Sequence, residues 1–162
     1  MRKCVYAGSF DPPTSGHKDI IEKCLKIFDE VVVAIMVNPK KTPFLTVNER
    51  VYLIEKLYKN DSRVKVVAFE GAAVDLLEQE KTPFYVRGIR NTVDFEYENA
   101  DMFASKKLKE DMITIYIPSE QNNLHISSSL ARASVKFKKD CSELIPKEIY
   151  EDFLKITEKK YV

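Results

Sequence analysis

The feature that most constrains the fold is the alternation of short apolar runs with segments of helical periodicity. Five runs are rich in β-branched and apolar residues, and several lack the polar alternation of a half-exposed strand, which is typical of strands covered on both faces of a sheet. These runs span residues 4–7, 31–37, 64–69, 84–86 and 112–117. Because helical segments separate the runs, the sequence predicts an α/β chain built from consecutive βα units.

Local signals indicate where the helices lie. Thr46 and Glu49 form a capping-box pattern, Ser127-Ser128-Ser129 opens a helix after the fifth strand, and Pro146 starts the last one. Apolar residues recur at helical spacing in 20–28, 51–58, 74–77 and about 93–108. With short right-handed crossovers, we expect a Rossmann-like, doubly wound five-stranded parallel sheet of order 3-2-1-4-5 with C-terminal helices.

The length of the chain limits the number of domains, and its net charge limits the classes of partner that it can attract. The chain has 162 residues, so we expect a single domain over 1–162 with a full core. Its 26 Lys and Arg residues against 25 Asp and Glu leave a net charge of +1, so neither nucleic acid nor a membrane is an expected partner. Three cysteines without C-x-x-C spacing argue against a disulfide framework and a zinc site. Without a signal-peptide core or a long apolar run, we expect a cytoplasmic location.

A glycine-containing loop joins the first predicted strand to the first helix. Its sequence is Gly8-Ser9-Phe10-Asp11-Pro12-Pro13-Thr14-Ser15-Gly16-His17, which is neither a G-x-G-x-x-G fingerprint nor a P-loop. A helix start attracts anions, and we expect His17 to add a donor that can carry charge near neutral pH. Gly8 and Gly16 would allow close approach of a ligand or a turn that side chains forbid. The loop predicts a phosphate site; the alternative is an ordinary turn with a capping or solvated histidine.

The fourth strand leads into Arg87-Gly88-Ile89-Arg90. Two guanidiniums on either side of a glycine can both bind phosphate oxygens without crowding the backbone, and together they would form a cationic pocket opposite His17. The alternative is that one of them pairs with Asp94, Glu96 or Glu98 at the start of the next helix.

Two further groups follow the second and fifth strands. Lys40 and Lys41 lie between prolines in a loop, and the alternative to a binding role is that they are merely exposed. Ser127-Ser128-Ser129 offers donors to a polyphosphate, and the alternative is an N-cap with spare serines. Because the carboxyl ends of parallel strands share one edge of a sheet, we expect all these groups in one active site. The chain has no nucleophile elbow or H-E-x-x-H motif, so group transfer between anions suits it best.

Two segments resemble known motifs. The loop ending in Gly16-His17 resembles the T/HxGH signature of the nucleotidylyltransferase superfamily, and Ile126-Ser127-Ser128-Ser129 resembles its ISSS-type motif. Arg87-Gly88-Ile89-Arg90 with Asp94-Phe95-Glu96-Tyr97-Glu98, and the Pro39-Lys40-Lys41 loop, look like the bacterial phosphopantetheine adenylyltransferases along essentially the whole chain. The resemblance implies a nucleotidyltransferase of coenzyme A biosynthesis that converts ATP and 4′-phosphopantetheine to dephospho-CoA and pyrophosphate with Mg²⁺, as a homo-hexamer.

The resemblance also implies residue roles, with no residue assigned to a metal. His17, Lys41 and Arg90 would be catalytic, with His17 stabilising the transition state at the α-phosphate and Arg90 gripping the pyrophosphate side. The acceptor would be held by Ser9, Lys41 and Arg87, with Ala73 near its arm. ATP would contact Gly8, Ser9, Phe10, His17, Gly88, Ile89, Arg90, Glu98, Asn123, Leu124, His125, Ile126, Ser127, Ser128 and Ser129.

Two positions depart from the family pattern. The family often has an aromatic residue before the serine motif, where this chain has Asn122-Asn123-Leu124-His125, and it commonly has Thr where this chain has Ser9. The first departure alters the expected adenine-side contacts, and the second retains the hydroxyl. Two other functions stay open: a sibling nucleotidylyltransferase acting on a pyridine mononucleotide or a phosphorylated small alcohol, and a regulatory module that binds ATP without forming product.

Overall fold

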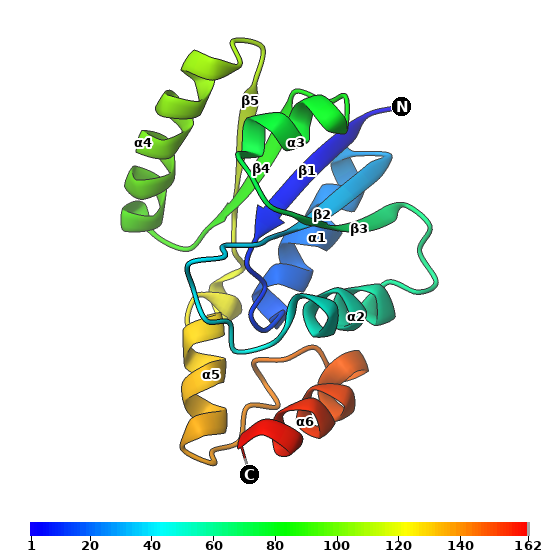
Figure 1. Ribbon diagram of the computed structural model, residues 1–162. Helices are drawn as coiled ribbons and strands as arrows, with labels where there is room; N and C mark the ends of the chain where they lie inside the picture. Colours follow the sequence, from blue (N-terminus) through cyan, green and yellow to red (C-terminus); the bar gives the residue numbers. More distant parts are fainter. Residues whose placement is uncertain (162) are drawn as a thin grey trace.

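The computed structural model describes residues 1–161 and contains a five-stranded parallel sheet of order β3-β2-β1-β4-β5 (Figure 1). Its strands are β1 (Lys3–Gly8), β2 (Glu30–Met36), β3 (Val64–Phe69), β4 (Phe84–Ile89) and β5 (Ile113–Pro118). The chain moves outward from β1 to β3 and restarts on the other side of β1 with β4. The predicted strand order is confirmed.

Helices follow every strand, as the sequence predicts. The elements are α1 (Ser15–Ile27), α2 (Val47–Leu57), α3 (Ala73–Gln79), α4 (Thr92–Leu108), the 3-10 turn η1 (Gln121–Asn123), α5 (Ser128–Lys136) and α6 (Lys147–Tyr161). The predicted capping box of α2 is confirmed, since Thr46 Oγ1 accepts from the Glu49 N–H at 3.2 Å and Glu49 Oε2 accepts from the Thr46 N–H at 2.8 Å. Within the described residues, no helix combines the length and apolar character needed to cross a bilayer.

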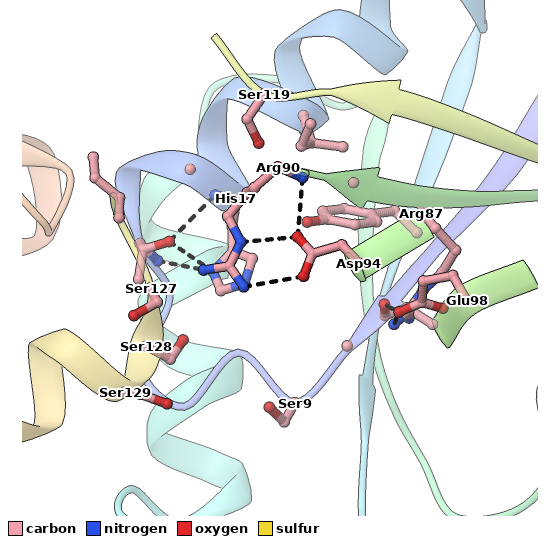
Figure 2. Close-up of a pocket in the computed structure, with 18 of the residues that line it drawn as sticks. Ser9, His17, Arg87, Arg90, Asp94, Glu98, Ser119, Ser127, Ser128 and Ser129 are labelled. Atoms are coloured by element: carbon pink, nitrogen blue, oxygen red, sulfur yellow. Dashed lines mark hydrogen bonds and ion pairs between the residues drawn. The ribbon is translucent and has the colours of Figure 1, made fainter. Parts of the chain in front are cut away.

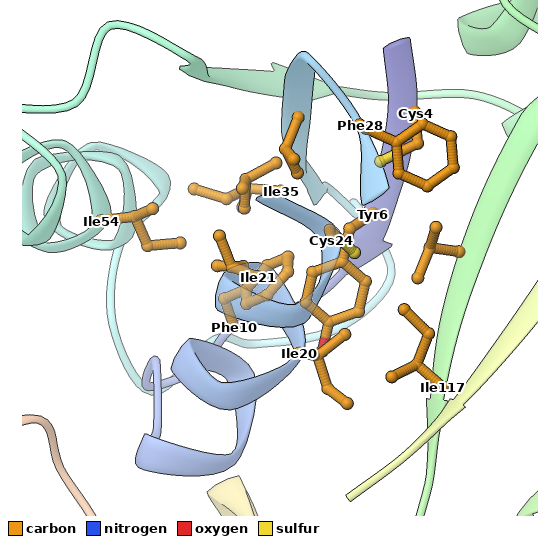
Figure 3. Packing of buried hydrophobic residues seen from close by; sticks show 13 residues of the cluster. Cys4, Tyr6, Phe10, Ile20, Ile21, Cys24, Phe28, Ile35, Ile54 and Ile117 are labelled. Atoms are coloured by element: carbon orange, nitrogen blue, oxygen red, sulfur yellow. The ribbon is translucent and has the colours of Figure 1, made fainter. Parts of the chain in front are cut away.

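The core divides between the two faces of the sheet. On one face, β1 and β2 pack against α1 and α2 around Tyr6 and Ile21 (Figure 3). On the opposite face, Val5 and Ala34 pack against Leu77 of α3. Because successive residues of a strand point to opposite faces, an uninterrupted apolar run such as that of β2 supplies both clusters.

A third apolar cluster attaches the last two helices. Leu45, Leu53, Ile145, Ile149 and Phe153 are buried together, and full burial of such a side chain stabilises by about 1.5–3 kcal/mol. α6 therefore packs on α2 and on the end of the β2–α2 loop (residues 37–46) rather than on the sheet.

Several boundaries differ from the prediction, including those of β1 and β5, which are each shifted by one residue. β2 and α6 begin one residue from their expected starts, a usual variation at the ends of elements. β4 extends to Ile89 because its backbone continues to pair with β5, Arg87 opposite Tyr116 and Gly88 opposite Ile117. Arg87 and Gly88 therefore belong to the strand instead of the loop after it.

Gly88 has a packing role that differs from the one expected. A Cβ at this position would lie 3.0 Å from Ile20 Cγ1 and 3.3 Å from Ile20 Cδ1, and Ile20 of α1 is itself buried. The absence of a side chain lets β4 and α1 approach closely, which is a requirement of the core.

We predict that Gly88→Ala lowers the free energy of unfolding by about 1–3 kcal/mol, because the added methyl group overpacks the contact with Ile20. Gly16→Ala is the matched control: a Cβ there would meet ordinary contacts of 3.5 Å or more in the first turn of α1, so its stability should be unchanged or higher. Urea denaturation measures both. Equal stability of Gly88→Ala and the wild type would contradict this account of the β4–α1 contact.

Candidate active site

Two adjoining cavities are lined by residues from the carboxyl edge of the sheet. The loops after β1, β2, β4 and β5 meet at this edge (Figure 1). The first has a volume of about 370 Å³, and His17, Arg90 and the start of α5 line it (Figure 2). The second, of about 600 Å³, is lined by Lys41 and its loop. Because Ser9 and Arg132 line both cavities, the groups predicted from four separate loops lie in one continuous region.

The loop between β1 and α1 is held by its own side chains and by the β2–α2 loop. Thr14 caps α1, and its Oγ1 accepts the backbone N–H of His17 at 3.3 Å. The Asp11 carboxylate accepts the backbone N–H groups of Phe44 and Leu45 at 2.8 and 2.7 Å. Two charge-assisted hydrogen bonds thus compensate a buried charge and fix one loop to the other.

The orientation of the His17 ring decides which nitrogen can serve a ligand. Nδ1 lies 3.0 Å from the backbone nitrogen of Thr14. An amide N–H only donates, so Nδ1 must be the unprotonated nitrogen and Nε2 carries the proton of the neutral ring. The Phe10 ring packs against the imidazole, with 4.7 Å between the ring centroids. His17 therefore offers one N–H donor, held in orientation from two sides.

The surroundings of His17 oppose its protonation. Burial lowers the pKa of His17 to about 4, and the charges of Arg90 and Arg87 act in the same direction. The positive end of the α1 dipole likewise disfavours another positive charge. The imidazole is therefore neutral at pH 7, and the expectation that it carries charge near neutral pH is wrong.

Both arginines of the β4 segment are paired with carboxylates from α4. Arg87 donates to Glu98 Oε1 at 2.5 Å and to the backbone oxygen of Ala7 at 2.7 Å. Arg90 donates through Nε to Asp94 Oδ2 at 3.0 Å. The alternative of a helix-start ion pair, which the sequence suggested for one of the two arginines, thus holds for both of them. The reason is helical spacing, which brings Asp94 and Glu98 onto the same face of α4.

This pairing changes the charge of the first cavity. Burial acts to raise the pKa of Asp94, but hydrogen bonds and the charge of Arg90 outweigh it and hold that pKa below its usual value. Asp94 is therefore ionised at neutral pH. An anionic ligand has to compete with Asp94 for Arg90, whose side chain is still 38% exposed, more than the 25% of Arg87.

Arg132 is a site residue that the sequence analysis missed. In the part of the chain that the structure describes, it donates to the Asp11 backbone oxygen at 2.7 Å and to Ser129 Oγ at 3.1 Å, and to no carboxylate. Its charge is therefore more available than those of Arg87 and Arg90. A usable signal was its position three residues after Ser129, which places it on the same side of a helix.

The three serines at the start of α5 each have a partner. Ser127 caps the helix by accepting the Leu130 N–H at 3.1 Å, and Ser128 donates to the Pro12 backbone oxygen at 2.8 Å. Ser129 accepts from Arg132. The alternative of an N-cap is confirmed, but none of the serines is spare, and all three line the first cavity.

The remaining predicted residues fall into two groups. Gly8, Ser9, Arg87, Gly88, Glu98 and Ile126 line the first cavity. Phe10 is buried against His17, and Ile89 accepts the Ser119 N–H through its backbone oxygen. Asn123 ends η1, and Leu124 and His125 lie between η1 and α5. Ala73 lies at the start of α3. These last residues line neither cavity, so their contacts with ATP or acceptor stay predictions.

Gly8 and Gly16 do not have the backbone conformation that only glycine favours. Among the described glycines, only Gly71 has a positive φ, of 143°. A Cβ at Gly8 or Gly16 would meet its nearest neighbours at 3.4 Å or more. The expectation of a turn forbidden to other residues is wrong, and their value for ligand approach stays a prediction.

Comparisons with known proteins agree with this geometry. The Cytidylyltransferase-like family model matches residues 5–134. Phosphopantetheine adenylyltransferase of Clostridium beijerinckii is 41% identical over 154 residues, covering 95% of this chain and 97% of that protein, and that of Finegoldia magna is 42% identical over 150 residues, covering 93% of each. The chain belongs to the phosphopantetheine adenylyltransferases, within the cytidylyltransferase-like family.

A solved structure from Vibrio parahaemolyticus, assigned as a nicotinate-nucleotide adenylyltransferase, has a TM-score of 0.76 at 23% identity and covers 99% of this chain and 98% of that one. This likeness bears on the fold alone.

We predict that the His17 ring stays neutral and keeps the Nε2–H tautomer from pH 8 down to about pH 5, since its pKa is about 4. The unfolded chain takes up a proton near the ordinary pKa of about 6.5, so His17 lowers the stability of the folded state as pH falls from about 6.5 to 4. Long-range ¹H–¹⁵N NMR spectra read both the tautomer and the titration, with His17→Gln to assign the signal among two histidines. Titration near pH 6.5 or a proton on Nδ1 would contradict the geometry.

Proposed function

We propose that this protein transfers the adenylyl group of ATP to 4′-phosphopantetheine, giving dephospho-CoA and pyrophosphate. The observation that carries the proposal is the similarity to phosphopantetheine adenylyltransferases over 95% of the chain. The site supports it, since two phosphate-binding motifs and three arginines surround the first cavity and Lys41 lines the adjoining one.

The reaction depends on stabilising negative charge more than on transferring a proton. A phosphate oxygen of the acceptor attacks the α-phosphorus of ATP in line, a new P–O bond forms, and the bond to the bridging oxygen breaks as pyrophosphate leaves. The attacking phosphate is already anionic at pH 7, so no general base is required. The protein contributes positioning and stabilisation of the charge that develops on the phosphoryl oxygens.

The donors have distinct places in this scheme. The Nε2–H of His17 would donate to an oxygen of the α-phosphate, as a neutral donor whose tautomer Thr14 maintains. Arg90, Arg132 and the serine cluster (Ser127, Ser128 and Ser129) at the start of α5 would bind the departing pyrophosphate, because they all line the first cavity.

The acceptor would bind at the junction of the two cavities. Ser9 lines both of them and Lys41 lines the second, so together they can hold its phosphate. Arg87 would contribute only by sharing its guanidinium with Glu98, to which it is bound at 2.5 Å. Ala73 would lie near the pantetheine arm and Glu98 near ATP.

Magnesium would arrive with ATP. Among residues 1–161, no group of three or more His, Cys, Asp or Glu side chains is placed to hold a metal ion, and the carboxylates of the first cavity already bind arginines. Mg²⁺ often binds mainly through substrate phosphates and water. We therefore infer that Mg²⁺ enters as the complex with ATP, which is the substrate.

Two broader inferences accompany the activity. A homo-hexamer is inferred from the family resemblance. Self-association, though not the number of copies, is supported by α4, which exposes Val93, Tyr97, Phe103 and Leu108 and buries no residue in the single chain. A cytoplasmic location is supported by Cys4, Cys24 and Cys141, which are all unpaired thiols. Analytical ultracentrifugation tests the first inference, and fractionation of the source cells tests the second.

The activity is tested by measuring pyrophosphate release from ATP and Mg²⁺ with purified protein and each candidate acceptor. We expect release that depends strictly on 4′-phosphopantetheine, with dephospho-CoA as the product identified by mass spectrometry. Release with nicotinate mononucleotide instead would assign a sibling transferase. ATP binding without release with any acceptor would assign a regulatory module.

We predict that His17→Ala lowers kcat by about 10²–10³-fold, the usual effect of losing one donor to a transition state. Circular dichroism verifies that the variant is folded, because the imidazole packs against the buried Phe10 ring. Thr14→Val, which removes the Oγ1 cap but keeps the backbone N–H that orients Nδ1, should lower kcat much less. Unchanged turnover in His17→Ala would remove His17 from the mechanism.

A further inference from the structure

The β2–α2 loop is long and largely exposed between two anchors. At its start, the Lys41 N–H donates to the Asn38 backbone oxygen at 3.1 Å and closes a local turn. Residues 38–43 are exposed, whereas Phe44 is half-buried and Leu45 is fully buried. The position of Lys41 therefore depends on how firmly the chain is held at Phe44, three residues later.

Phe44 is held from two opposite sides. Its N–H donates to Asp11 Oδ2 at 2.8 Å, and its carbonyl oxygen accepts the hydroxyl of Tyr161 at 2.8 Å. The rings of Phe44 and Tyr161 are also stacked, with centroids 4.6 Å apart and planes 2° from parallel. Asp11 belongs to the loop between β1 and α1, whereas Tyr161 lies in the last turn of α6 and lines neither cavity.

The last turn of α6 makes a second contact beside this one. Lys160 Nζ lies 2.5 Å from Glu49 Oε2, and the same carboxylate oxygen accepts the Thr46 N–H in the capping box of α2. Lys160 and Tyr161 thus bind the two ends of the short segment 44–49, where the loop becomes a helix.

Phe44 also lines the second cavity, together with Lys41. A wall of this cavity is therefore supported from behind by Tyr161, whose side chain does not line it. From these contacts we propose that Tyr161 is a positioning residue for the acceptor: by stacking on Phe44 and binding its carbonyl oxygen, it holds the loop that carries Lys41. The proposal rests on the proposed function for its substrate, but not for the physical link between Tyr161 and the loop.

The chain offers a matched control. Tyr52 of α2 is 47% exposed, close to the 43% of Tyr161, and its hydroxyl donates to Asp152 of α6. Each tyrosine thus joins α6 to the rest of the molecule, but Tyr52 contacts α6 away from the Lys41 loop. If the substitutions only weaken the packing of α6, both alanine variants should show the effect. If Tyr161 positions the loop, only Tyr161→Ala should show it.

The first measurement is steady-state kinetics of the wild type, Tyr161→Ala, Tyr161→Phe and Tyr52→Ala. A stacked pair and a neutral hydrogen bond are together lost in Tyr161→Ala, so we expect the KM for 4′-phosphopantetheine to rise about 5- to 10-fold. The KM for ATP should change by less than about 2-fold. Tyr161→Phe keeps the ring and should recover most of the loss, and Tyr52→Ala should match the wild type.

The second measurement is the rate of tryptic cleavage after Lys40 and Lys41 in the folded protein, read by mass spectrometry. It needs no substrate. We expect cleavage several-fold faster in Tyr161→Ala than in the wild type, with little change in Tyr161→Phe or Tyr52→Ala. Circular dichroism under the same conditions verifies that each variant is folded.

The outcomes separate the two proposals. If the wild type is inactive with 4′-phosphopantetheine, the proposed function fails, and cleavage alone decides whether Tyr161 holds the loop. Unchanged cleavage in Tyr161→Ala overturns the proposal. Faster cleavage with an unchanged acceptor KM in an active enzyme also overturns it, as does an equal effect of Tyr52→Ala.

Discussion

Parallel pairing of β1 on both of its edges is the constraint on which the rest of the structure depends. β1 pairs with β2 from Lys3 to Gly8 and with β4 at Val5 and Tyr6, so the chain winds away from it in both directions. All five strands point the same way, and their carboxyl ends must open at one edge. The loops after β1 and β4 face each other there, with α5 and the β2–α2 loop closing the sides.

The charged groups of the site restrain one another. His17 is neutral because it is buried near Arg87 and Arg90, and those arginines are themselves held by Glu98 and Asp94. Ion pairs therefore preorganise two of the three arginines of the site, and Arg132 keeps its charge more available. An arriving polyphosphate exchanges partners within an existing network, so binding depends on geometry as well as on attraction.

The loop that carries Lys41 is held by elements from both ends of the chain. Asp11 reaches it from the β1–α1 loop. Arg50 of α2 donates to the backbone oxygens of Ser9 at 2.8 Å and Thr46 at 3.4 Å, which ties the same two loops together. Tyr161 approaches from α6. Packing of α6 on α2, far from the phosphate motifs, thus bears on the shape of the second cavity.

Much of the fold and part of the site could be predicted from the sequence. The apolar runs predicted the number of strands, and the rule of short right-handed crossovers predicted their order. The Thr14–His17 and Ser127–Ser129 segments indicated two helix starts, which line one cavity. These features are local or follow from general rules of chain geometry, so a linear pattern is sufficient to read them.

Only the tertiary structure decided the protonation of His17, the pairing of both arginines and the place of Arg132 between the cavities. Each depends on distances between groups from different elements. The pKa of His17 depends on burial and on the arginines of β4, and the ion pairs depend on how α4 follows β4. The place of Arg132 depends on the packing of α5 against Pro12. The contact of Tyr161 with Phe44 is of the same kind. Burial and electrostatic energies are set by proximity in space, which residue order alone does not specify.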